Sequence, residues 1–317
     1  MLRTTIMSTS DTVLLFDAGA GTAQGGRPFQ EDRYTVILPD QFPAQTSDKL
    51  AFFAVYDGHG SDLVSEHASK NLHTLLVKRP EFEKGDYEGA IKGALEDEDS
   101  ILLESFMNDK NTEPAVVGST VALCFVNLTK GVLVVGNLGD SHIILAQRNA
   151  SNEMPYNVQR LTRSHKPGLP SEKARIERAG GTVHNRTGTT RLGTLNMSRA
   201  LGDLQYKNPI NTIDDGSLTK ARKAVAASPE ARGDFLSHEP HLSRVTLTSD
   251  SRYALVCLTD GVCDSTDDGT LIGHVMKKSM RGERAADIAQ EISSLSASTT
   301  SSDNATCIVV FLDGVNS

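Results

Sequence analysis

Two apolar runs in this chain each lead into an aspartate that is followed at once by a glycine, and they restrict the folds open to it. Residues 52–56 precede Asp57-Gly58, and residues 253–258 end one residue before Asp260-Gly261. Short apolar runs are typical of buried strands, so each carboxylate is expected at the rim of a sheet, where glycine lets the backbone turn sharply. Such rims, brought together with Asp303-Asn304, can hold hard divalent cations through oxygen ligands. The pattern favours a metal-dependent hydrolase.

The bulk composition argues against two classes of partner. The chain has 317 residues, 38% of them hydrophobic and 23% charged, which is ordinary for one large globular domain or two small ones. Its net charge of −8 argues against a nucleic-acid-binding protein that relies on a basic face. No apolar run approaches the roughly 20 residues that cross a bilayer. We therefore expect neither nucleic acid nor a membrane as a partner.

Cysteine usage and the N-terminal residues indicate an intracellular protein. The four cysteines are scattered, form no Cys-x-x-Cys pair and mostly lie in apolar runs, which favours core positions in a reducing compartment. The apolar run at 12–16 is too short for a signal peptide. Arg3 and the nearby threonines and serines resemble a mitochondrial leader, but a disordered start is the simpler interpretation. We expect a soluble protein of the cytoplasm or nucleus rather than of mitochondria.

Hydrophobic periodicity predicts paired helices and antiparallel strands. Residues 62–77 and 87–107 carry apolar side chains at helical spacing, and Pro80 follows the first of these helices. Further helices are expected at 171–179 and 284–295, and strands at 33–38, 51–56, 117–126, 131–136, 142–147, 253–259 and 305–312. Because consecutive helices and hairpins replace strict strand–helix alternation, the pattern favours antiparallel sheets with helices outside.

The chain has no internal repeat and no long linker, which predicts a single domain over residues 23–314 after an N-terminal extension, residues 1–22. The stretch 204–240 is polar, contains three prolines and lacks clean periodicity, so we expect an irregular, flap-like insertion there. A solvated face is the simplest role, and substrate docking the alternative, for its basic cluster, Lys220, Arg222 and Lys223.

Nine short motifs follow one another in a characteristic order. They are Arg27-x-x-x-Glu31-Asp32, Phe53-Ala-Val-Tyr-Asp57-Gly-His-Gly, Gly118-Ser-Thr, Asn137-Leu-Gly-Asp140-Ser, His165-Lys-Pro, Ala179-Gly-Gly, Ser198-Arg-Ala-Leu-Gly-Asp203, Thr259-Asp260-Gly and Asp303-Asn304-Ala-Thr. In this order the motifs resemble the metal-dependent protein phosphatase 2C (PP2C, or PPM) family of Ser/Thr protein phosphatases. Each motif alone is weak, whereas nine in the right order, over nearly the whole chain, are very specific.

The resemblance implies an α+β fold and a metal centre. The expected fold is a four-layer α-β-β-α sandwich, in which two antiparallel sheets are flanked by antiparallel helix pairs. The expected cofactors are two Mn²⁺ or Mg²⁺ ions at one edge of the sandwich, with a weaker third ion. By position, Asp57 bridges the two main ions, and the other implied ligands are Glu31 and the Gly58 carbonyl on one ion, Asp260 and Asp303 on the other, and Asp140 and Asp264 on the third.

The chemistry of phosphate esters agrees with two cations. A phosphate monoester dianion repels nucleophiles and hydrolyses very slowly. Two cations about 3.5–4 Å apart neutralise it and acidify a bridging water to hydroxide, which attacks phosphorus in line. No cysteine or serine here has the setting of an activated nucleophile, so we expect direct attack without a phosphoenzyme. The resemblance thus implies dephosphorylation of phosphoserine and phosphothreonine in phosphoprotein substrates, with a role in signalling.

Arg27 and His59 are the candidate catalytic residues. A guanidinium offers a flat, permanently charged fork that matches two phosphate oxygens, and Arg27 stands four residues before Glu31. His59 directly follows Asp57-Gly58. Imidazole titrates near working pH, so His59 is the candidate general acid for the departing serine or threonine oxygen. Three further charged residues, Arg191, Arg199 and Asp203, are interpreted as structural parts of a packed turn.

Two departures from the family pattern concern packing and regulation rather than the metal ligands. Cys263 stands where a bulky aromatic residue is common, and Ser164 precedes His165-Lys166-Pro167 where an aspartate is frequent. Two other functions stay open. One is a pseudophosphatase that uses the fold as a binding module, which the presence of the main carboxylates disfavours, and the other is a metal-dependent hydrolase of small phosphoesters or nucleotides. We expect the chain to act as a monomer.

Overall fold

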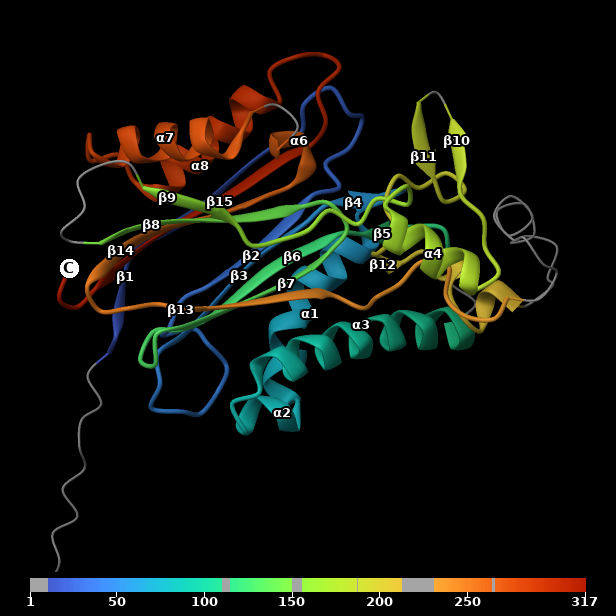
Figure 1. Cartoon of the computed structure of the whole chain (residues 1–317), viewed down its shortest axis with the longest axis horizontal. Coiled ribbons are helices and arrows are strands. Elements are labelled where there is room, and N and C mark those ends of the chain that lie inside the picture. The colour runs from blue at the N-terminus through green and yellow to red at the C-terminus, as the bar shows by residue number, and fades with distance from the viewer. Residues whose placement is uncertain (1–10, 110–114, 150–155, 187, 213–230, 264–265) are drawn as a thin grey trace, which may run out of the picture.

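The computed structural model describes residues 11–109, 115–149, 156–186, 188–212, 231–263 and 266–317. In this part of the chain two five-stranded sheets lie face to face, and helices cover their outer faces (Figure 1). All neighbouring strands within these two sheets are antiparallel. The four-layer α-β-β-α sandwich expected from the sequence is therefore confirmed.

The strand order differs from the chain order in both sheets. The first sheet runs β1 (Val13–Ala23), β15 (Ala305–Gly314), β14 (Ser251–Leu258), β8 (His142–Asn149) and β9 (Asn157–Arg160). The second sheet runs β13 (His241–Thr246), β7 (Val132–Leu138), β6 (Val121–Asn127), β3 (Leu50–Tyr56) and β2 (Arg33–Ile37). The expected hairpin joins β6 to β7, where the Asn127 side chain accepts a hydrogen bond from the Lys130 N–H and Gly131 has a positive φ.

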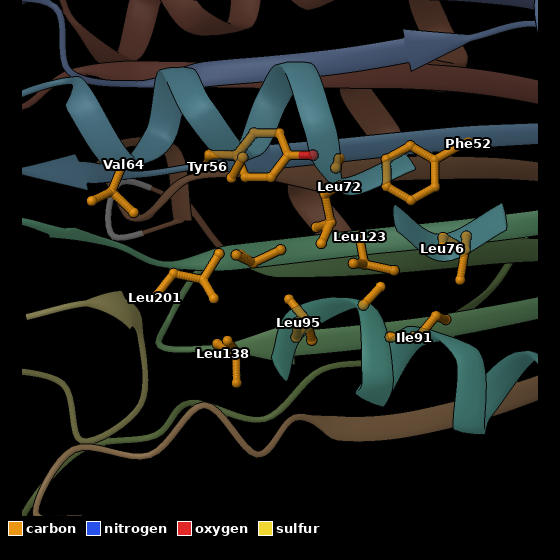
Figure 2. Packing of buried hydrophobic residues seen from close by; sticks show 14 of the residues in the cluster. Phe52, Tyr56, Val64, Leu72, Leu76, Ile91, Leu95, Leu123, Leu138 and Leu201 are labelled. Carbon is orange, nitrogen blue, oxygen red and sulfur yellow. The ribbon is translucent and has the colours of Figure 1, made fainter. Parts of the chain in front are cut away.

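β3 is buried on both faces, which explains why it reads as one continuous apolar run. Phe53 and Val55 pack in the cluster between the two sheets. Phe52 and Tyr56 point the other way, because side chains alternate along a strand, and they pack against helix residues such as Leu72 (Figure 2). One short segment therefore contributes to two core layers and places whatever follows it at the end of the sandwich.

The helices form two separate covers. α1 (Leu63–Lys78), α2 (Pro80–Glu83) and α3 (Tyr87–Asp109) pack on the second sheet, and α7 (Asp268–Ser279) and α8 (Ala285–Ser296) pack on the first. The expected helices over 62–77, 87–107 and 284–295 are confirmed to within two residues at each end. α7 and β13 lie in stretches where no element is expected from the sequence. β13 is an edge strand with mostly half-exposed side chains, so it lacks an apolar run.

The expected N-terminal extension, residues 1–22, is wrong for residues 13–22, which form most of the edge strand β1, paired with β15. Gly19 and Gly21 weaken the strand pattern of this segment. Packing requires both glycines, because a Cβ on Gly19 would overlap Ala286 and a Cβ on Gly21 would overlap Gln290, both in α8. The missing side chains let α8 lie directly on the backbone of β1.

A smaller unit lies beside the sandwich (Figure 1). It carries α4 (Pro170–Arg178) and a hairpin of β10 (His184–Arg186) and β11 (Thr189–Arg191). Its apolar cluster includes Ile176 of α4 together with Tyr206 and Phe235.

The stretch 204–240 is more ordered at its ends than its composition suggests. It begins with two short 3₁₀ helices, η2 (Leu204–Tyr206) and η3 (Ile210–Thr212), and Phe235 near its end is buried. Its central part lies outside the described residues, as do Lys220, Arg222 and Lys223.

The structure also bears on the expectations for the cysteines and for membrane-spanning helices. Cys124, Cys257 and Cys307 are free and buried, as expected for core cysteines, and Cys263 is partly buried. Among the helices that the structure describes, none has both the length and the apolar character needed to cross a bilayer.

Candidate metal and phosphate site

Strand register brings the acidic motifs to one end of each sheet. Arg33 of β2 pairs with Tyr56 of β3, so the residue before β2, Asp32, and the residue after β3, Asp57, lie at the same end. In the first sheet Leu258 pairs with Cys307, which places the segment after β14 beside the segment before β15. These two segments carry Asp260 and Asp303 respectively.

Contacts between the sheets show that these two ends coincide. Thr259 donates a hydrogen bond to Asp32 Oδ2 at 2.8 Å, and the Glu31 N–H donates to Asn304 Oδ1, also at 2.8 Å. The carboxyl groups of Asp57 and Asp260 lie within hydrogen-bonding reach of each other. Motifs from the two halves of the chain are thereby assembled into one acidic edge, which we define as Glu31, Asp32, Asp57, Asp140, Asp260 and Asp303.

Glycine is required at two positions of this edge. A Cβ on Gly58 would overlap the carbonyl oxygen of Glu31, and a Cβ on Gly261 would overlap the carbonyl oxygen of Asn304. In each Asp-Gly pair the glycine thus allows a close backbone approach beside the carboxylate. Gly58 begins β4 (Gly58–His59), which pairs with β5 (Gly118–Ser119), and β5 also pairs with β12 (Leu201–Gly202).

The acidic edge is electrostatically unfavourable without a cation. Burial, and then the negative charges of Asp260, Asp32 and Asp140, hold the pKa of Asp57 well above its usual range. Burial likewise raises the pKa of Asp32, and hydrogen bonds from Thr306 and Thr259 only partly offset it. Burial also raises the pKa of Glu31. Carboxylates that repel one another in this way are stabilised by a bound cation.

The donor set fits a hard divalent cation. All its side-chain donors are carboxylate oxygens, the type that Mg²⁺ and Mn²⁺ prefer. Oδ1 of Asp32 and Oδ1 of Asp140 are buried and have no hydrogen-bond partner among the described residues. These two oxygens are therefore free to accept a ligand.

The carboxylates do not yet form a closed metal shell. Within the described ranges, no three acidic, histidine or cysteine side chains converge on one point. Asp303 is instead paired with Arg27 at 2.6 Å, and Asp140 is paired with Lys166. Cations of the chain itself thus hold two expected ligands. The assignment of ligands to individual ions stays a prediction, and Asp264 lies outside the described residues.

Both candidate catalytic residues lie at this edge. The side chain of Arg27 is 54% exposed, and its contact with Asp303 shows that its guanidinium reaches the carboxylates. His59 Nε2 lies 2.6 Å from Asp203 Oδ2. Burial disfavours the charged imidazole, but the charge and hydrogen bond of Asp203, with Glu31 and Asp140, outweigh burial and raise the pKa of His59.

Asp203 is a residue whose role the sequence analysis missed. The sequence predicts a packed turn at Asp203, and the residue does form one, since its N–H donates to the Val117 carbonyl and its φ is +47°. Its buried carboxylate also holds His59. A Cβ on Gly118 would overlap this carboxylate, so glycine there makes room for the pair. The available signal was a charged residue directly after Leu201-Gly202, in a turn with no other obvious need for charge.

Comparisons with known proteins agree with this architecture. The family model described as Protein phosphatase 2C matches residues 16–305. A protein phosphatase 2C homolog 3 of Schizosaccharomyces pombe is 32% identical over 274 residues, which cover 86% of this chain and 58% of that protein. A protein phosphatase 2C homolog 2 of Aspergillus flavus is 31% identical over 267 residues, which cover 82% of this chain and 54% of that protein.

A solved structure of a serine-threonine phosphatase 2C from Toxoplasma gondii has a TM-score of 0.72 at 24% identity, covering 96% of this chain and all of that one. At this level of identity, the similarity between the two structures is evidence for a shared fold. The fold and the acidic edge define the structural class of the protein, which is a two-sheet sandwich with an oxygen-donor site at one end. The chain belongs to the protein phosphatase 2C family. It spans a little over half the length of the two curated relatives described above.

Proposed function

We propose that this chain is a divalent-cation-dependent protein phosphatase that hydrolyses phosphoserine and phosphothreonine. The observation that carries the proposal is the convergence of Asp57 and Asp260, from different sheets, in a member of this family. Two Mn²⁺ or Mg²⁺ ions, when bound, would neutralise the phosphate dianion and lower the pKa of a bound water. Glu31, Asp57, the Gly58 carbonyl, Asp260 and Asp303 are the proposed main ligands, with Asp140 and Asp264 for a weaker third ion.

The chain's own groups have distinct roles in this proposal. Arg27, which pairs with Asp303 in this structure, would contact the phosphate oxygens when Asp303 serves as a metal ligand. His59 protonates the departing serine or threonine oxygen. Asp203 accepts a hydrogen bond from His59 Nε2, and the second ring nitrogen, Nδ1, is buried without a hydrogen-bond partner among the described residues. Asp203 is thus a positioning residue.

Phosphate release from a phosphothreonine peptide by metal-stripped protein tests the function. We expect no release in EDTA, recovery on titration with Mn²⁺ or Mg²⁺, and loss again when EDTA is added in excess. Folded protein with metal bound but no phosphate release would contradict the proposal and favour a binding module.

The proposed substrates are phosphoproteins, and the free buried cysteines are compatible with a reducing compartment inside the cell.

The substrate class is tested by comparing turnover of the phosphopeptide with turnover of a nucleotide and of a sugar phosphate at equal concentration. We expect the phosphopeptide to be hydrolysed with the highest kcat/KM. Faster turnover of either small phosphoester would instead support a small-molecule hydrolase.

A further inference from the structure

A cavity lies between the smaller unit and the sandwich. It has a volume of about 620 Å³ and is lined by residues 163–165, the start of α4, Arg199, and the segment from Pro240 into the start of β13. Figure 1 shows α4 beside this last segment. No predicted metal ligand and neither candidate catalytic residue lines the cavity. It is therefore distinct from the acidic edge.

The lining of the cavity carries more positive than negative charge. Arg163 is exposed and lines it, and no carboxylate of a described residue lies within ion-pair distance of its guanidinium. The one acidic residue in the lining, Glu172, is bonded by the guanidinium groups of both Arg199 and Arg175. The lining itself thus carries two arginine charges, those of Arg163 and Arg199, and one carboxylate charge, which leaves one positive charge in excess.

The two histidines that line the cavity are held in their neutral form, mainly by burial. Burial, and then the charges of Arg163 and Arg199, lower the pKa of His241. Burial, and then Arg199, lower the pKa of His165 to about 3. Both imidazoles are therefore neutral near pH 7, and the arginines carry the charge.

His165 presents a hydrogen-bond donor that has no acceptor. The residue is only 5% exposed, and its Nδ1 accepts a hydrogen bond from the Gly139 N–H at 3.1 Å. Nδ1 is therefore the unprotonated nitrogen, so Nε2 carries the hydrogen. No acceptor for this N–H exists among the described residues. His165 lines the cavity, and Nε2–H is the hydrogen-bonding group of its ring that Gly139 does not engage.

The start of α4 adds donors from a third direction. Pro170 has no N–H, and the N–H groups of Ser171 and Glu172 have no intrahelical acceptor because they belong to the first turn. The N-cap residue Leu169 offers no side chain that could accept from them. The positive end of the helix dipole and these N–H groups favour an anion.

We propose that this cavity binds a phosphate group. A tetrahedral dianion has enough oxygens to accept hydrogen bonds from the Arg163 guanidinium, the His165 Nε2–H and the first turn of α4, whereas a carboxylate has only two. The phosphate belongs either to a phosphorylated side chain or to free inorganic phosphate. The proposal does not depend on catalysis at the acidic edge.

The test is a calorimetric titration of the full chain with inorganic phosphate or a phosphothreonine peptide, carried out in EDTA so that no metal ion is bound. The starting protein carries Arg27→Ala, which removes the proposed phosphate contact at the acidic edge. We expect saturable binding of inorganic phosphate or of a phosphothreonine peptide. Arg163→Glu, and independently Ser164→Asp, should weaken it at least about tenfold, because each places a negative charge in the cavity. Ser164 Oγ lies 3.2 Å from His142 Nε2, and an aspartate can keep that contact.

Arg281→Glu is the matched control, because Arg281 is exposed and does not line the cavity. It should leave the affinity unchanged. Tighter binding of the peptide than of phosphate would assign the site to phosphorylated chains, and equal binding would assign it to the free anion. The proposal would be overturned if neither probe showed saturable binding. It would also be overturned if Arg163→Glu and Ser164→Asp bound the probes with the same affinity as the starting protein while melting at the same temperature. Phosphate release by the metal-loaded wild type is measured separately, so failure of the site and failure of the proposed function are distinguishable.

Discussion

At the scale of single residues, His59 and Asp203 show how a candidate catalytic group depends on a distant partner. The two residues are 144 positions apart, and their side chains meet at 2.6 Å. Asp203 is almost fully buried, so solvent does not compete for its carboxylate. A carboxylate that accepts from one imidazole nitrogen fixes the ring orientation and the position of its second hydrogen-bonding nitrogen.

The first prediction concerns this pair. Asp203→Asn should lower kcat for a phosphothreonine peptide at least about tenfold, because His59 loses its orienting charge. The loss should be smaller for p-nitrophenyl phosphate, whose leaving group needs little protonation. Steady-state kinetics on both substrates, with His59→Ala alongside, give the comparison. Equal losses on both substrates would assign Asp203 a purely structural role.

At the scale of elements, packing of α8 on β1 depends on glycine. Gly19 faces the backbone of Ala286 so closely that any Cβ would overlap it. Gly273 in the middle of α7 is the opposite case, since a Cβ there would meet nothing within 4 Å. The same substitution should therefore have opposite effects on stability at the two positions.

The second prediction compares Gly19→Ala with Gly273→Ala. Gly19→Ala should lower the free energy of unfolding by about 1–3 kcal/mol, because α8 must move away from β1. Gly273→Ala should raise it by about 0.5–1 kcal/mol, since alanine favours a helix interior. Denaturant unfolding measures both. A stabilising effect of Gly19→Ala would show that the helix is not in direct contact with the strand.

The third prediction concerns the attachment of α4. Glu172 of α4 is 3% exposed and is bonded by Arg199, Ser198 and Arg175. Although burial opposes ionisation, these partners lower the pKa of Glu172 from 4.5 to about 2. Glu172→Gln should therefore lower the free energy of unfolding by about 3 kcal/mol at neutral pH, because two arginine charges lose their partner.

The pH dependence of this effect has a defined sign. A carboxyl with a lowered pKa in the folded state stabilises that state above its unfolded pKa, and the contribution is lost as pH falls toward the folded pKa. The difference between wild type and Glu172→Gln should thus be full above pH 4.5 and shrink toward pH 2. Unfolding curves over this range provide the measurement. A difference that stays constant across the range would contradict the role of the Glu172 charge.

At the scale of the whole molecule, the acidic edge joins the two sheets where their carboxylates repel one another. The raised pKa of Asp57 expresses this repulsion, after burial. A bound divalent cation would relieve it and would link both sheets. Metal binding is therefore expected to stabilise the entire sandwich rather than one loop.

The fourth prediction follows from this linkage. Mn²⁺ at about 100 times its Kd should stabilise the wild-type protein by about 2.7 kcal/mol, and EDTA should reverse the effect. Asp57→Asn should abolish turnover and most of the metal-induced rise in Tm. In EDTA this variant should be at least as stable as wild type, since one repelling charge is gone. If the Tm of the wild-type protein did not change on addition of Mn²⁺ while the protein remained active, the linkage would be contradicted.

The sequence alone determined the elements with strong local patterns and the identity of the acidic motifs. The helices α1, α3 and α8 and the strand β3 are readable because burial on a fixed face imposes a period on the sequence. The Asp-Gly pairs are readable because a strand end with a close backbone approach needs both residues. Motif order then indicated the family, and the fold followed from it.

Only the tertiary structure decided which side chains meet. The expected position of β1 outside the domain was wrong because its glycines serve contact with α8, which no local pattern reveals. Asp203 meets His59 through the pairing of β12 with β5 and of β5 with β4. The cavity proposed to bind phosphate lies where the start of α4 faces the start of β13. Such contacts depend on strand register and helix packing between segments far apart in the chain, whereas sequence periodicity records only the face on which each segment is buried.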